Sequence, residues 1–246
     1  MIVSGGDEAG RGSMLGPLVV SLVSVSKGMV RKLSDIGVRD SKMLTSRARE
    51  ALYDQIREIA SDIQVSKITP QEINDAMRKG VSLNELEAMH FAKMLDKIDG
   101  HVDVLYLDSP DVIPEKFGLR VKLSSARPVR VDGIKAERKS GVKPTKIVSE
   151  HKADSKYPVV SAASIIAKVT RDAEIRRLAE ETGIKIGSGY TSDYVTIEAI
   201  REHRTDPKLK PHIREYWKTM QEIRQSRLFD YLQVPKGKGA KRATQA

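Results

Sequence analysis

Residues 2–26 read IVSGGDEAGRGSMLGPLVVSLVSVS, and this stretch decides the fold because two β-forming segments flank a glycine-rich turn. Residues 2–7 are typical of a short strand, and residues 17–26 are apolar and β-branched enough for a buried one. Together they predict a β-hairpin at the start of an α/β domain.

Two adjacent acids, Asp7 and Glu8, lie where the first strand enters the turn. Neighbouring strand residues point to opposite faces of a sheet, so both acids serve one site only if the backbone bends directly after Asp7. Gly10 and Gly12 make such a bend sterically easy. The alternative is a solvated acidic turn, which is the usual reading of an isolated acidic pair.

The rest of the chain alternates helical and strand patterns, as an α/β sheet protein requires. The small residues Ala162, Ala163 and Ala167 predict a close approach of one long helix to the sheet. We expect helices over 46–62, from Pro70 onward, over 82–98 and over 159–181, strands over 63–69, 103–108 and 145–154, irregular structure over 109–144, and separate helical segments after Ser192.

Composition limits the class of function. The net charge is +10 and the pI is about 9.6, which favours a polyanionic partner such as nucleic acid. Aromatic residues make up only 4% of the chain, so duplex backbone contact is favoured over single-strand stacking. The absence of cysteine leaves oxygen or imidazole ligands for any metal. With no apolar run or signal sequence, we expect a soluble cytoplasmic protein that does not contact a membrane.

Several motifs occur in an order that resembles archaeal ribonuclease HII, over residues 1 to about 232. They are DEAGRG at 7–12 followed by GPLVV, RDSK at 39–42, LDS at 107–109, EHKAD at 150–154 with SAASIIAKVTRD, GSGY at 187–190 and WKT at 217–219. The resemblance implies a ribonuclease H-like fold, a mixed central sheet flanked by helices, with a small C-terminal helical domain. The expected division is 1–190 (catalytic domain), 191–234 (helical domain) and 235–246 (basic disordered tail).

The resemblance implies a metal-binding, catalytic quartet of Asp7, Glu8, Asp108 and Asp154. Phosphodiester hydrolysis needs an activated water and a neutralised leaving oxygen, which two divalent ions supply. Four acids without cysteine suit Mg²⁺ or Mn²⁺. The loop acids Asp111 and Asp132 match no motif and are expected to be plain surface residues.

Substrate contacts follow from the same resemblance. The turn glycines can approach a sugar closely and read a 2′-hydroxyl, the group that separates RNA from DNA. Without the resemblance, residues 10–12 would be a plain turn, Tyr190 a half-buried core residue, and Lys42 and Lys152 solvated lysines. The implied contact residues are Gly10, Arg11, Gly12, Lys42, Lys152 and Tyr190.

The predicted activity is endonucleolytic cutting of the RNA strand of RNA/DNA hybrids and of DNA on the 5′ side of embedded ribonucleotides. The products carry 3′-hydroxyl and 5′-phosphate ends. One alternative is a non-catalytic binder of hybrid duplexes, against which the four acids argue. Another is a nuclease or resolvase of the same fold, which would lack the glycine turn and the tyrosine together.

The end of the last helical pattern, residues 225–232, resembles a sliding-clamp-binding peptide. Such peptides present a glutamine, an aliphatic residue three positions on and aromatics beyond it to a pocket. Gln225, Leu228 and Tyr231 have that spacing, and Leu232 stands where a second aromatic is usual. The alternative is that Leu228, Phe229 and Leu232 pack the last helix onto the catalytic domain. We expect the enzyme to be a monomer.

Overall fold

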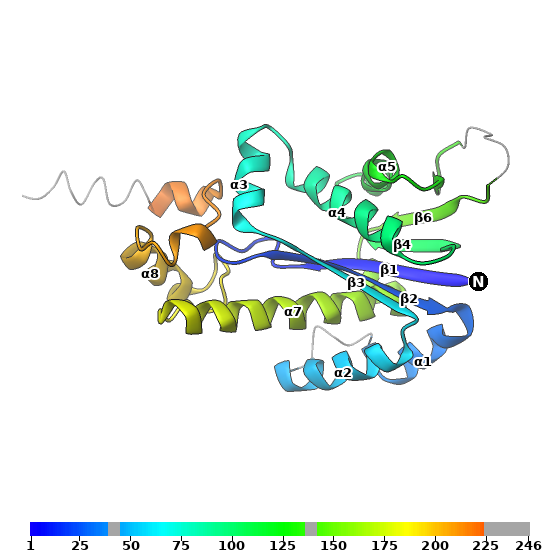
Figure 1. Cartoon of the computed structure of the whole chain (residues 1–246), viewed down its shortest axis with the longest axis horizontal. Helices are drawn as coiled ribbons and strands as arrows, with labels where there is room; N and C mark the ends of the chain where they lie inside the picture. Colours follow the sequence, from blue (N-terminus) through cyan, green and yellow to red (C-terminus); the bar gives the residue numbers. More distant parts are fainter. Residues whose placement is uncertain (39–44, 136–141, 224–246) are drawn as a thin grey trace, which may run out of the picture.

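A six-stranded mixed β-sheet organises the chain, with helices on both of its faces (Figure 1). The computed structural model describes residues 1–38, 45–135 and 142–223. One apolar cluster fills the space between the sheet and helices α3, α4 and α5, and a second fills the space between the sheet and α1, α2 and α7. The α/β layering predicted from the sequence is therefore confirmed.

The sheet has the strand order β3-β2-β1-β4-β6-β5. Strands β1, β2 and β3 form an antiparallel meander, whereas β4, β6 and β5 run parallel to β1 and to one another. The predicted hairpin is confirmed, and β4 lies in the interior of the sheet between β1 and β6. The strands span Ile2–Ala9 (β1), Leu18–Ser26 (β2), Asp62–Ile68 (β3), Val104–Asp108 (β4), Val129–Val131 (β5) and Thr145–Glu150 (β6).

Helices α2, α3 and α4 each begin directly after a capping residue. The side chains of Thr45, Thr69 and Ser82 each accept a hydrogen bond from the backbone amide three residues on, which satisfies an amide that has no partner within the helix. The helices span Val30–Asp35 (α1), Ser46–Ile59 (α2), Pro70–Arg78 (α3), Leu83–Lys97 (α4), Pro114–Ser124 (α5), Ala153–Lys156 (α6), Pro158–Thr182 (α7) and Tyr194–His203 (α8), with short 3-10 turns at Lys27–Met29 and Lys210–His212.

Helix α7 lies directly on β1, as its small residues predict. Ala162, Ala163 and Ala167 are fully buried. At Gly5, an added Cβ would lie 2.3 Å from the carbonyl carbon of Val159, so the two backbones meet where β1 has no side chain. This contact fixes α7, and the segment before it, against the end of the central strands.

The prediction that 109–144 has little regular structure is wrong. Its described part contains α5 and β5, and β5 is an edge strand of the sheet. Pro114 stands in the first turn of α5, where a missing amide costs nothing, so proline starts this helix instead of breaking it. Phe117 and Val121, one helical turn apart, are both fully buried and join the first core cluster.

The described residues after 191 pack around the turn between β1 and β2. Ile200 and Ile213 join a third apolar cluster together with Met14, Leu15 and Ile175. The chain also pairs with the turn through an isolated bridge between Leu15 and Ile213. No helix within 1–38, 45–135 or 142–223 is long and apolar enough to cross a membrane. The separation of a C-terminal domain at 191 stays a prediction.

Candidate active site

Asp7 and Glu8 lie at the end of β1, but the predicted bend directly after Asp7 is wrong. Strand β1 continues to Ala9, which still pairs with Val19 of β2. Asp7 is 6% exposed, and the Glu8 amide donates to its Oδ1 at 2.7 Å. The pair therefore belongs to a regular strand, and the glycine turn begins only after it. The charge of Asp108 nevertheless acts on both carboxyls, so both lie near it without the bend.

Asp108 and Asp154 reach the same sheet edge from the neighbouring segments. Asp108 ends β4, which runs parallel to β1, so the carboxyl ends of both strands lie together. The Ala153 amide donates to Asp108 Oδ1 at 2.7 Å, which ties the start of α6 to the end of β4. Asp154, the next residue, is 6% exposed. The four predicted acids are thus brought to one edge of the sheet.

Burial and mutual repulsion disfavour the charged forms of Asp7 and Glu8. The pKa of Asp7 is raised well above its usual value, first by burial and then by the charges of Glu8 and Asp108. Burial, followed by the charge of Glu87, raises the pKa of Glu8 to about 8. Within the described ranges, Glu8 Oε2 is buried without a hydrogen-bond partner. A cation at this edge would offset the repulsion.

The carboxyls do not form a closed metal cage on their own. Over 1–38, 45–135 and 142–223, no three or more histidine, aspartate or glutamate side chains are grouped closely enough to hold a metal ion. A divalent ion that keeps several waters and takes substrate oxygens needs only part of its shell from the protein. The donor set is all oxygen, which fits a hard cation.

The glycine turn and Tyr190 lie side by side. Gly10 has φ +91°, a left-handed conformation that favours glycine. Beyond the turn, Ser13 forms an isolated bridge with Tyr190, and the Met14 amide donates to the Gly189 carbonyl at 2.8 Å. Two motifs far apart in the sequence therefore form one surface beside the acids.

A buried arginine that sequence reasoning missed holds this surface together. The Arg171 guanidinium carbon lies 4.2 Å from the centre of the Tyr190 ring. Its Nη2 donates to Ser13 Oγ at 2.6 Å and to the Ser188 carbonyl at 2.7 Å. An added Cβ at Gly10 would lie 2.5 Å from Arg171 Nε, so glycine is required there for space as well as for φ.

The Arg11 side chain turns inward, away from a role as a free phosphate contact. Its Nη1 lies 2.5 Å from both carboxylate oxygens of Glu87, and its Nη2 hydrogen-bonds Asn84 Oδ1. Glu87 is fully buried on α4. The sequence offers one signal for this role, a charged residue on a helix between the apolar residues Leu86 and Phe91.

Lys152 is exposed and occupies the turn between β6 and α6. Its φ of 55° is left-handed, and it is the one non-glycine residue of the described ranges with a positive φ. Such conformations cost energy and concentrate at functional sites. Lys42 lies outside the described residues, as do Gln225, Leu228, Tyr231 and Leu232.

The two loop acids set aside from the sequence differ from each other. Asp132 is exposed and pairs with Lys146 at 3.0 Å, as expected of a surface residue. The same expectation for Asp111 is wrong, because its side chain is only 12% exposed. It accepts hydrogen bonds from Asn84 Nδ2 at 2.6 Å and from Arg120 Nε at 3.1 Å. Asp111 therefore belongs to the network beside the site.

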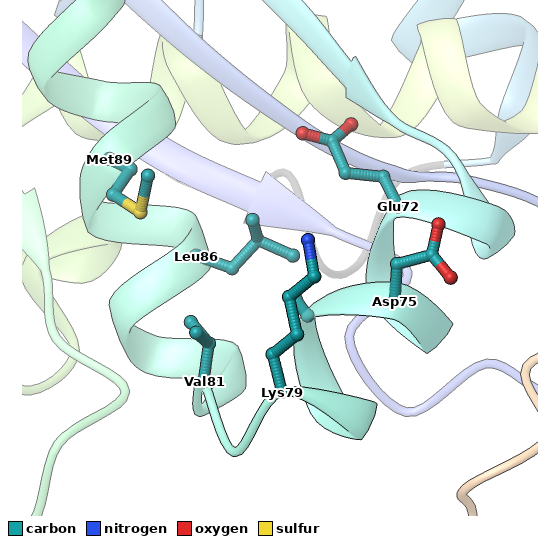
Figure 2. A pocket seen from close by; sticks show the side chains of 7 residues that line it. Glu72, Asp75, Lys79, Val81, Leu86 and Met89 are labelled. Atoms are coloured by element: carbon teal, nitrogen blue, oxygen red, sulfur yellow. The ribbon is translucent and has the colours of Figure 1, made fainter.

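A pocket of about 440 Å³ between α3 and α4 lies apart from this chemistry (Figure 2). None of the four acids at the sheet edge lines it. Apolar side chains from α4, Leu86 and Met89, face charged ones from α3, Glu72 and Asp75. The lining residues are Glu72, Asp75, Ala76, Lys79, Val81, Leu86 and Met89.

A mixed sheet of this order, covered by helices on both faces and bearing acids at the ends of its central strands, places the chain among the ribonuclease H-like enzymes. The family model described as Ribonuclease HII matches residues 4–220. The chain belongs to the ribonuclease HII family. It is a metal-dependent hydrolase that acts on RNA in RNA/DNA hybrids.

Individual relatives agree over nearly the whole length. The ribonuclease HII of Thermococcus onnurineus is 41% identical over 224 residues, which are 91% of this chain and 90% of that protein. The crystal structure of ribonuclease H2 from Pyrococcus horikoshii is similar with a TM-score of 0.77 and 38% identity, covering 92% of this chain and 98% of the other. A chain in the structure of the PCNA:RNase HII complex from Archaeoglobus fulgidus is similar with a TM-score of 0.74 and 36% identity, covering 89% and 96%.

Proposed function

We propose that this enzyme cuts on the 5′ side of ribonucleotides, both in RNA/DNA hybrids and embedded singly in duplex DNA, and leaves 3′-hydroxyl and 5′-phosphate ends. The observation that carries the proposal is the position of the glycine turn and Tyr190 beside the acidic sheet edge. A site that reads a sugar and a site that hydrolyses a phosphodiester thus adjoin each other.

In this proposal Asp7, Glu8, Asp108 and Asp154 hold two Mg²⁺ or Mn²⁺ ions. The fit rests on the all-oxygen donor set, on the raised pKa values of Asp7 and Glu8, and on the buried, unpaired Glu8 Oε2 within the described residues. When bound, such ions activate a water and neutralise the leaving oxygen.

The protein's own residues bind and orient the duplex. The backbone of Gly10, Arg11 and Gly12 approaches the sugar and reads its 2′-hydroxyl, and Tyr190 packs against the next nucleotide. Lys42 and Lys152 contact phosphate, and the net charge of +10 supplies affinity that does not depend on sequence.

The central experiment is cleavage of a DNA duplex with one ribonucleotide, beside a full hybrid and plain DNA, with and without chelator. We expect both ribonucleotide-containing substrates to be cut only with metal, and plain DNA to stay intact. Asp7→Asn and Asp108→Asn should abolish cleavage while duplex binding persists, because basic residues supply most of the affinity. Asp132→Asn, in an exposed loop, is the matched control.

Near-normal turnover by Asp7→Asn would refute the metal assignment. A wild-type protein that binds the hybrid without cutting it in Mg²⁺ or Mn²⁺ would favour the non-catalytic binder instead. Cutting of plain DNA at a comparable rate would favour a nuclease or resolvase of the same fold.

The sliding clamp is the proposed protein partner, through Gln225, Leu228, Tyr231 and Leu232. The structural relative from Archaeoglobus fulgidus is described in a complex with PCNA. Titration of the clamp against the full chain and a truncation after Arg224 tests the proposal, with loss of binding expected on truncation. Equal binding by both forms, or by neither, would contradict it, whereas a truncated chain that unfolds would favour a packing role.

A cellular role in removing misincorporated ribonucleotides and primer RNA, as a cytoplasmic monomer, completes the proposal. Accumulation of ribonucleotides in genomic DNA after deletion of the gene would support that role, and size-exclusion chromatography with light scattering measures the oligomeric state. An unchanged ribonucleotide content would contradict it.

A further inference from the structure

The Arg11 guanidinium is bound to the protein itself. It is one third exposed, its Nη1 lies 2.5 Å from both oxygens of the Glu87 carboxylate, and its Nη2 hydrogen-bonds Asn84. A guanidinium held in this way fixes the backbone from which it extends. Arg11 therefore acts on the glycine turn through its own main chain.

Helix α4 links the glycine turn to the loop after β4. Asn84 and Glu87 are three residues apart and thus share one face of the helix. Besides bonding Arg11, Asn84 donates to Asp111 Oδ1 at 2.6 Å. The turn follows Glu8, and the Asp111 loop follows Asp108. The same helix face thus holds both segments that continue from the central acids.

The turn is also held from its other side. Arg214, which is fully buried, donates through Nη1 to the Arg11 carbonyl at 3.2 Å and through Nε to the Gly16 carbonyl at 3.0 Å. Because the Arg11 side chain is held by Glu87 and its carbonyl by Arg214, the orientation of this peptide is fixed at two points.

A packing role alone explains Glu87 poorly. Burial of an ion pair costs desolvation that an apolar residue of similar size avoids, so a buried pair is weak evidence for stability. The residues around Glu87 on α4, Leu86 and Ala88, are themselves buried and apolar. A carboxylate at this position calls for a geometric role.

We propose that Glu87 is a positioning residue for ribonucleotide recognition, which holds the Gly10–Gly12 backbone in its reading geometry through Arg11, with Asn84 as the second anchor. The inference rests on the proposed function, in which this backbone reads the 2′-hydroxyl. It predicts that loss of Glu87 weakens the discrimination between RNA and DNA more than it weakens duplex binding.

The test measures duplex binding by variants that also carry Asp7→Asn. In the presence of Mg²⁺, this parent variant is expected to bind the duplex without cutting it. Fluorescence anisotropy gives Kd for a duplex with one ribonucleotide and for the all-DNA duplex of the same sequence. Glu87→Gln should lower the ratio of the two affinities about tenfold, on the order expected for a lost hydrogen bond to a buried group, and leave the all-DNA Kd within about twofold. Glu85→Gln, on the same helix but exposed, is the matched control.

A double-mutant cycle separates positioning from general damage. If Arg11 and Glu87 act as one unit, Arg11→Gln lowers the ratio as far as Glu87→Gln does, and the double variant lowers it no further. Equal loss of affinity for both duplexes, with a lower Tm, would assign Glu87 a packing role and overturn the inference.

The outcomes also separate this inference from the function on which it rests. Equal binding of the two duplexes by the Asp7→Asn parent would refute the proposed reading of the 2′-hydroxyl, and the inference with it. If the Asp7→Asn parent prefers the duplex with a ribonucleotide and the Glu87→Gln form shows the same preference, the inference is overturned and the proposed function stands. If Glu87→Gln does not fold, Asn84→Ala removes the second anchor without leaving a buried charge. An unchanged ratio of the two duplex affinities in Asn84→Ala would then overturn the inference.

Discussion

The Glu8 carboxyl is expected to make the metal-free enzyme less stable as the pH rises. Burial first, and the charge of Glu87 second, raise the pKa of Glu8 from 4.5 to about 8, with Arg11 opposing the shift. In the unfolded chain the carboxyl returns to its ordinary value. The unfolded state therefore releases this proton at a lower pH than the folded state does.

The sign and size follow from proton linkage. Between the two pKa values the unfolded state is ionised while the folded state still holds the proton, so each added pH unit favours unfolding by up to about 1.4 kcal/mol. From about pH 5 to pH 7, this amounts to roughly 2 to 3 kcal/mol of lost stability from Glu8. The raised pKa of Asp7 acts in the same direction. The lowered pKa values of Glu150 and Asp193 act oppositely, at lower pH.

Urea unfolding in chelator, followed by circular dichroism at several pH values, measures the effect. Glu8→Gln should remove the Glu8 share of the slope of stability against pH, leave the share of Asp7, and be the more stable protein near pH 7, although it is expected to be inactive. Saturating Mg²⁺ should also flatten the wild-type slope, since a cation favours the ionised carboxyl. Glu202→Gln, an exposed change on α8, is the control. Equal slopes for the wild type and Glu8→Gln would refute the reasoning.

Three further predictions concern single positions. Gly5→Ala should destabilise the protein by about 3 kcal/mol or more, because the backbone of α7 leaves no room for a Cβ. The control is Gly28→Ala, where a Cβ meets nothing within 4 Å and should cost little stability, and urea unfolding compares the two variants. Lys152→Gly should be about 1 kcal/mol more stable than Lys152→Ala, since only glycine adopts φ 55° without strain, while both lose the same duplex affinity in an anisotropy titration. Tyr190→Ala should slow cutting at a lone ribonucleotide far more than it weakens duplex binding, with the exposed Tyr194→Ala as control; equal loss on every substrate would indicate a folding role.

The elements that the sequence predicted well are those whose pattern is local. The hairpin of β1 and β2 shows in its β-branched run and its glycines, and α7 shows in its length and small residues. Helix α5 lies in 109–144, where the sequence predicts irregular structure, because the apolar pattern of this helix is short. Its two fully buried apolar residues, Phe117 and Val121, make up only one helical repeat. A repeat of this length does not predict a helix before the sheet against which it packs is known.

The acids of the site were predicted, but the groups that hold their surroundings were not. Arg171 contacts Ser13, and Arg214 contacts Arg11 and Gly16, across more than 150 residues of chain. An arginine looks solvated in a sequence because its burial depends on partners that only the fold brings near. The same is true of Glu87, whose partner Arg11 lies 76 residues away in the chain.

Two buried groups at the site, Glu8 and Arg214, each have a charge of their own sign as the largest charged influence on their pKa. Glu8 has another carboxylate, Glu87, as its largest charged influence, and its pKa is raised. Arg214 has Arg171 in that position, and burial together with this like charge lowers its pKa to about 9. Each group is thus buried near a neighbour of its own sign. A divalent cation among the carboxylates would offset the repulsion between them. Cation binding at the acids would therefore raise the free energy of unfolding, so metal binding and folding are linked.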